Sequence, residues 1–248
     1  MRAPDESRDD RDETGAAQKR QDTRDEQPGL AQATARLLAG AGVPFAVLGT
    51  EEWCCGNPLI SVGQIEAARP VVERNLDAIK RSGATTVLTS CAECYKTIKV
   101  DYPKLLDKST SDLGFQVVHI TEYAADLLNK GAIKFGKPVN LRLTYHDPCQ
   151  LGRLSEPWHN WQGVHKKMGI LEPARAWRRG THGVYQPPRD LLKAIPGLEL
   201  VEMERAREQA WCCGAGNGVK TAFPDFALWT AGERLEEAAA VGAEAIVS

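Results

Sequence analysis

The hydrophobic pattern divides the chain into a polar start and a longer stretch of alternating helices and strands. Residues 1–28 carry dense mixed charge and contain no Leu, Ile, Val, Phe, Tyr or Trp. Such a segment has too little apolar surface to offset the entropy lost on ordering. We therefore expect residues 1–28 to be a disordered charged tail.

After this tail, the apolar positions predict helices followed by short strands. Residues 30–42 have the spacing of a short amphipathic helix ended by glycine, and residues 43–49 are an aliphatic run typical of a buried strand. Residues 65–83 predict a longer helix, and residues 84–90 predict a strand that leads into Cys91.

The alternation continues in the rest of the chain. Residues 121–130 predict a helix, residues 139–147 a strand that leads to Cys149, and residues 198–203 a further strand. Helices that alternate with aliphatic strands indicate parallel strands covered by helices. The predicted fold class is α/β, with mainly parallel strands, flanking helices, and cysteines at strand ends and helix starts.

An internal repeat indicates how the chain is divided into halves. The tetrapeptide WCCG occurs at residues 53–56 and again at residues 211–214, which is 158 positions later (211 − 53 = 158). A helical stretch and then an aliphatic strand follow each copy. We expect two pseudo-repeated halves, residues 29–138 and residues 139–248.

The repeat looks incomplete at both ends. Cys91 follows Ser90 in the first copy, and the position that matches Ser90 is residue 248 (90 + 158 = 248), so the matching cysteine would come after Ser248. Cys149 introduces the second copy from a strand, whereas no cysteine introduces the first. We expect a second half that is truncated before its CxxC, and a truncated or misassigned reading frame would explain both ends.

The composition and the net charge argue against several classes of function. The chain has 248 residues, 42% of them hydrophobic and 26% charged, and a net charge of −2, which gives no electrostatic reason to expect nucleic acid as a partner. No apolar run reaches the roughly 18 residues of a membrane span, and no secretory signal pattern is present. We expect a cytoplasmic protein without direct membrane insertion, or one that is peripheral to a membrane-associated complex.

Seven cysteines carry the candidate chemistry. Cytoplasmic thiols stay reduced, and an odd number cannot pair completely within one chain. A CxxC at the end of a strand places two thiolates near one metal centre, and the crossover after a Cys-Cys pair can bring that pair to the same place. The first candidate site therefore contains Cys54, Cys55, Cys91 and Cys94.

Other uses of these cysteines stay open at this point. The alternatives are inert core residues, a four-thiolate zinc site and a catalytic dithiol of the thioredoxin type. Zinc is the strongest competitor, although zinc ribbons usually pair two CxxC knuckles and this chain has one. A thioredoxin-type dithiol does not normally have a Cys-Cys pair beside it.

The segments WCCG, SCAEC, YHDPCQLGR and WCCGAGNG resemble the CCG cysteine-rich domain. This domain is shared by the B-type and D-type subunits of heterodisulfide reductase and by iron–sulfur subunits of lactate and glycolate oxidation and of benzoyl-CoA reductase complexes. The resemblance covers residues 30–248. It implies two motifs that each hold a [4Fe–4S]-type cluster through a lone cysteine, a Cys-Cys pair and a CxxC.

By position, the first motif lacks its lone cysteine and is matched by Cys54, Cys55, Cys91 and Cys94. The second motif lacks its CxxC and is matched by Cys149, Cys212 and Cys213. The resemblance implies an iron–sulfur electron-transfer subunit of a heterodisulfide-reductase-like oxidoreductase complex, with flavin- or ferredoxin-type subunits as partners. It identifies no catalytic residue. The alternatives are a zinc-stabilised structural or interaction module and a truncated non-functional fragment.

Two features near the cysteines of the second motif have more than one interpretation. Gly214, Gly216 and Gly218 lack the spacing of a phosphate-binding loop, and we expect them to let backbone N–H groups approach an anionic cluster. His146 and Asp147 precede Cys149, and they are either proton donors near a cluster or hydrogen-bonded residues at the end of a strand.

A long insertion at about residues 154–186 separates Cys149 from Cys212. It is either a solvated loop held by a few tryptophans or a lid or docking surface, because Trp and Arg are enriched at interface hot spots. The side chains in question are Trp158, Trp161, Trp177, Lys166, Lys167, Arg178 and Arg179.

Overall fold

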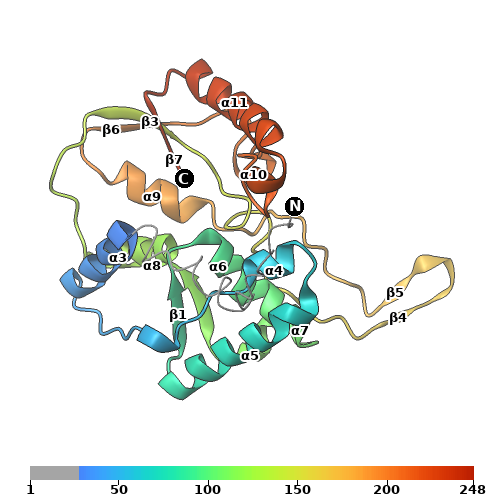
Figure 1. Ribbon diagram of the computed structural model, residues 1–248. Helices are drawn as coiled ribbons and strands as arrows, with labels where there is room; N and C mark the ends of the chain where they lie inside the picture. Colours follow the sequence, from blue (N-terminus) through green and yellow to red (C-terminus); the bar gives the residue numbers. More distant parts are fainter. Residues whose placement is uncertain (1–27) are drawn as a thin grey trace, which may run out of the picture.

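The computed structural model describes residues 28–248, in which three small sheets are accompanied by helices (Figure 1). The α/β fold class predicted from the sequence is confirmed, and the two larger sheets are parallel throughout. The predicted disorder of residues 1–28 lies outside the described residues, apart from Pro28, with which the first described helix begins.

The first half is built on two parallel strands, β1 (Thr86–Thr89) and β2 (Gln116–His119). Helix α5 (Ile65–Ser82) precedes β1, and helix α6 (Ala92–Lys96) begins directly after Cys91. The other elements of this half are α3 (Pro28–Gly40), η1 (Gly49–Glu51), α4 (Asn57–Ser61), the π-helical turn η2 (Thr97–Asp101), α7 (Tyr102–Leu105), η3 (Thr110–Leu113) and α8 (Ile120–Asn129).

Helix α5 supplies much of the core of the first half. Its buried residues include Ala68, Val72 and Leu76, a stripe at the spacing of one helix face. Val72 and Leu76 pack in one cluster with the side chains of Ile98, Tyr102 and Leu113. The segment that follows the CxxC is thereby fixed against the helix that follows the Cys-Cys pair.

In the second half, β3 (Leu141–Tyr145) lies between β6 (Leu198–Val201) and β7 (Ala245–Val247) and is parallel to both. Helix α11 (Pro224–Ala240) leads to β7 as α5 leads to β1, which agrees with the internal repeat. The other elements are α9 (Gln186–Lys193), η5 (Arg207–Gln209) and α10 (Val219–Ala222). Helices α8 and α9 pack against each other and join the two halves.

The predicted strand at residues 43–49 is wrong. The segment up to Leu48 has no regular structure, and Phe45 and Val47 are 46% and 59% exposed. In the second half, the run before the Cys-Cys pair forms β6 because β3 lies beside it. Within residues 28–248, no strand of the first half pairs with residues 43–48.

The segment at about residues 154–186 contains an antiparallel hairpin of β4 (Val164–His165) and β5 (Leu171–Glu172), and η4 (Lys167–Gly169) joins the two strands. This hairpin projects from the body of the protein (Figure 1). Trp158 anchors the start of the segment, because its backbone N–H donates to Thr110 Oγ1 at 2.8 Å. Trp177 is 74% exposed. The loop interpretation and the docking-surface interpretation of this segment both stay predictions.

Candidate metal centre

The first set of cysteines lies where two turns meet. Gly56 follows the Cys-Cys pair with a left-handed φ of 82°, which glycine adopts without strain, and its N–H donates to Cys54 Sγ at 3.2 Å. Cys91 occupies the position between β1 and α6, and Cys94 lies in the first turn of α6. The carboxyl end of a parallel strand thus presents the CxxC to the Cys-Cys pair.

The four cysteines of this set lie close enough for each to shift the pKa of a neighbour. Cys55 accepts hydrogen bonds from the thiols of Cys54 and Cys94, which hold the pKa of Cys55 well below its usual value. Cys94, whose thiol has a single proton for its two neighbours, also lowers the pKa of Cys91 to about 7. The donor thiols have raised pKa values, because each loses its hydrogen bond on ionisation. Cys55 and Cys91 are therefore the two thiols of this set whose pKa values lie below the ordinary value.

Buried amides hold this arrangement in place. The Asn75 side chain, on α5, donates to the backbone oxygen of Cys54 at 2.8 Å and to Tyr102 Oη at 2.9 Å. The Asn57 amide donates to the Glu93 carboxylate at 3.1 Å, which ties the first turn of α4 to the CxxC. The motifs in the sequence do not indicate these residues. The available signal was Asn75 itself, a polar residue within the apolar stripe of a predicted helix.

The second set contains three cysteines from two segments. Cys149 lies in the turn after β3, and its pKa is raised first by burial and then by the charges of Cys212 and Cys213. The Gly214 N–H donates to Cys212 Sγ at 3.3 Å, so side-chain-free backbone does approach a sulfur atom here. Cys212 is exposed, whereas Cys149 and Cys213 are half-buried.

His146 and Asp147 make structural contacts. His146 Nδ1 accepts a hydrogen bond from Arg234 Nε at 3.0 Å, and burial together with this guanidinium lowers the pKa of His146 to about 4. Asp147 forms a two-pronged ion pair with Arg189, at 2.6 and 2.8 Å, and both side chains are at most 2% exposed. These contacts agree with hydrogen-bonded residues at the end of a strand.

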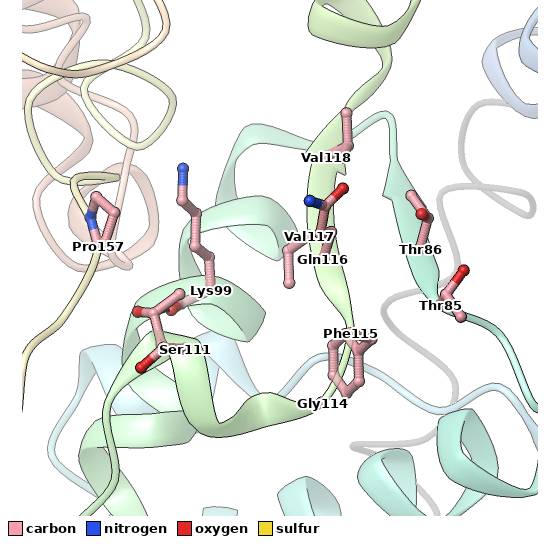
Figure 2. A pocket seen from close by; sticks show the side chains of 11 residues that line it. Thr85, Thr86, Lys99, Ser111, Gly114, Phe115, Gln116, Val117, Val118 and Pro157 are labelled. Carbon is pink, nitrogen blue, oxygen red and sulfur yellow. Dashed lines mark hydrogen bonds between the residues drawn. The ribbon is translucent and has the colours of Figure 1, made fainter.

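Two hollows accompany these segments. One of about 340 Å³ lies between the halves and is lined by Ser90 and Pro148, which are next to Cys91 and Cys149. Another, of about 750 Å³, lies along β2 and has no cysteine in its lining. Figure 2 shows that Lys99 and Pro157 lie across this second hollow from β2.

The chemistry of the donor sets fits a thiolate-bound metal group. The first set offers four sulfur atoms and the second offers three, and iron–sulfur clusters and zinc both use such ligands. Within residues 28–248, no three His, Cys, Asp or Glu side chains stand in the arrangement of the ligands of one metal ion.

Comparison with known proteins identifies relatives of both halves. The family model described as the cysteine-rich domain CCG matches residues 18–99 and 175–248. The D-type subunit of dihydromethanophenazine:CoB–CoM heterodisulfide reductase from Methanosarcina acetivorans is 42% identical over 88% of this chain and 47% of its own length. The B-type subunit of fumarate reductase (CoM/CoB) from Methanothermobacter marburgensis is 35% identical over 79% of this chain and 32% of its own.

A third relative, the EtfAB:quinone oxidoreductase of Syntrophomonas wolfei, is 34% identical over 76% of this chain and 22% of its own length. The chain thus spans about half the length, or less, of these curated relatives. Among the described residues, no helix combines the length and the apolar character needed to cross a membrane.

Proposed function

This chain belongs to the CCG cysteine-rich domain family, and we propose that it transfers electrons through iron–sulfur clusters within a larger oxidoreductase. The observation that carries the proposal is that the CxxC at the start of α6 lies beside the Cys-Cys pair, where the four cysteines are close enough to shift one another's pKa values. Packing alone does not require four thiols to meet, since core cysteines need no sulfur neighbours.

In the first site, the ligands would be Cys54, Cys55, Cys91 and Cys94, and a [4Fe–4S]-type cluster bound to them would accept and release electrons. The protein would contribute thiolate ligands, a fixed backbone and hydrogen bonds to sulfur. The N–H groups of Gly56 and Gly214 already point at cysteine sulfur atoms, and such donors stabilise negative charge on the ligands.

In the second site, the ligands would be Cys149, Cys212 and Cys213. Cys212 is exposed, so this site is the one of the two from which electrons would pass most directly to another molecule. The hydrogen bonds and charges around the two sites differ, and hydrogen bonds to sulfur and solvent exposure set the reduction potential of a cluster. We therefore expect the two sites to have different potentials.

Partner subunits would supply the rest of the electron path. We propose that a flavin- or ferredoxin-type subunit delivers or receives electrons, because the relatives include subunits of reductases. The relatives named above include one subunit of a heterodisulfide reductase and a quinone oxidoreductase. The proposed electron acceptor or donor is accordingly a disulfide, a quinone-linked chain or another subunit.

Anaerobic reconstitution with iron and sulfide tests this function. The wild-type protein should bind both and show broad visible absorbance. Cys91→Ser should lose most of the iron of the first site, because it removes one of the four ligands, and Cys149→Ser should leave that iron in place. Stoichiometric zinc in the purified protein without visible absorbance would contradict the proposal and favour a zinc-stabilised module.

A further inference from the structure

We infer that Arg153 is a positioning residue that holds the Cys149 turn against the Cys212–Cys213 segment, so that the three thiols act as one binding site. The inference rests on the proposed function, because it concerns the ligands of the second site. Its evidence is the set of contacts that flank these cysteines on both sides.

The Arg153 guanidinium joins the two cysteine-bearing segments. Its Nη1 donates to the Glu208 backbone oxygen at 3.1 Å, and its Nη2 donates to the Ala210 backbone oxygen at 2.8 Å. Ala210 is 2% exposed and precedes Trp211 and Cys212 directly. One planar fork thus spans two carbonyl groups immediately before the Cys-Cys pair, a geometry that a lysine ammonium cannot reproduce.

The backbone that carries Arg153 is fixed as well. The Leu154 N–H donates to the Cys149 backbone oxygen at 3.0 Å, so Arg153 lies within a closed turn that begins at Cys149. The insertion returns onto this turn at Gly180, where an added Cβ would lie 2.5 Å from Arg153 Cβ. Because the chain encloses Arg153 on this side, the direction of its side chain is restricted.

A second tether lies on the other side of Cys149. Asp147 Oδ2 accepts a hydrogen bond from the Arg207 N–H at 2.8 Å, and Arg189 pairs with the same carboxylate. Residues 147 and 153 therefore both bind the segment 207–210. Asp147 belongs to a fully buried ion pair whose loss would disturb the fold, so Arg153 is the residue that isolates the positioning effect.

Arsenite is a suitable probe, because As(III) binds three thiolates and needs no further ligand. The full 248-residue protein would be reduced, freed of metal and titrated with arsenite, and sulfur-to-arsenic absorbance would be recorded. The difference between wild type and Cys149→Ser defines the binding that requires Cys149. Thermal unfolding of each variant identifies any that fails to fold.

Arg153→Met and Arg153→Lys should both weaken the Cys149-dependent binding by about 10- to 100-fold, the usual effect of removing a group that orients a metal ligand. Arg81→Met is the matched control, because Arg81 is an exposed arginine paired with Glu51 and should leave arsenite binding unchanged. If the Met variant does not fold, the Lys variant, which keeps the aliphatic stem and the charge, decides the matter.

Unchanged arsenite affinity in the Arg153→Met or the Arg153→Lys variant would overturn the inference. Affinity that is lost in the Met variant and kept in the Lys variant would overturn it by showing that the charge at residue 153 matters and the geometry of the fork does not. Equal binding by wild type and Cys149→Ser would show that the three thiols do not form one site. A failure of the proposed function is distinguishable, since it would appear as absent iron at the first site with the arsenite result unaffected.

Discussion

Alanine substitutions at Gly56 and Gly214 test the two copies of the repeat against each other. Both glycines follow a Cys-Cys pair and have left-handed φ angles, 82° and 77°. Their surroundings differ. An added Cβ at Gly56 would meet a Val71 methyl at 3.7 Å, an ordinary contact, whereas at Gly214 it would lie 2.5 Å from the Ala227 backbone oxygen.

The size of each effect follows from the left-handed conformation of the glycine and from the contacts that an added Cβ would make. The left-handed conformation costs an L-residue about 1–2 kcal/mol, and this applies to both variants. Forced overpacking adds about 1–3 kcal/mol, and it applies to Gly214→Ala only, because the contact is with helix backbone that cannot move away alone. A gap of about 2 kcal/mol corresponds to roughly 4–8 °C in melting temperature for a domain of this size.

Thermal unfolding of the reduced, metal-free variants, followed by circular dichroism, measures the difference. Gly216→Ala is the control, since an added Cβ there meets nothing within 4 Å and φ lies outside the left-handed region. Its stability should stay within about 0.5 kcal/mol of wild type. Equal melting temperatures for Gly56→Ala and Gly214→Ala would refute the steric argument, and a large loss in Gly216→Ala would refute the conformational one.

Two further predictions concern the tail and pH. Deletion of residues 1–28 should leave the melting temperature nearly unchanged, because they offer no large apolar side chains; a fall of several degrees, about 1 kcal/mol or more, would contradict this. Burial lowers the pKa of His119 to about 4 from an ordinary value near 6.5, so its contribution to stability is present above pH 6.5 and is lost as pH falls towards 4. Urea unfolding at about pH 7 and about pH 5 should show a smaller stability difference for His119→Gln than for wild type, and an equal difference would contradict the assignment.

The sequence predicted those helices and strands whose hydrophobic pattern can be recognised within the segment itself. The stripe on α5 and the aliphatic runs of β1, β3 and β6 appear where they were expected. Strand β2 was missed, because Val117 and Val118 alone are too short a run to indicate a strand. This strand is specified by its parallel pairing with β1, a contact between segments about 30 residues apart.

The error at residues 43–49 has the same origin. This run and β6 both contain several aliphatic residues and both precede a Cys-Cys pair, yet only β6 is a strand. Strand propensity depends on the neighbouring strand and on burial, and not on the backbone preference of the residues alone. A pattern that identifies an aliphatic run therefore does not determine whether a partner lies beside it.

For the candidate site, the spacing predicts two sets of cysteine ligands, which stay a prediction, and it does not indicate which residues hold their segments in place. The CxxC and the Cys-Cys pair are recognisable because thiols are rare and their order is repeated. Asn75 and Arg153 are common residue types, and each binds backbone far away in the sequence, 21 and 57 positions from Cys54 and Ala210 respectively. Their roles depend on tertiary contacts that no local pattern records.

The halves also meet through side chains of the two cysteine regions. The Ser61 hydroxyl lies 3.1 Å from the amide oxygens of both Asn57 and Asn217. The side chain of Gln150, the neighbour of Cys149, donates to the same Asn217 oxygen at 3.1 Å. Asn57 in turn reaches Glu93 within the CxxC, so polar contacts run from one cysteine set to the other. Side-chain hydrogen bonds therefore connect the segments that carry the two cysteine sets, because a displacement of Asn217 would break its hydrogen bonds to both Ser61 and Gln150.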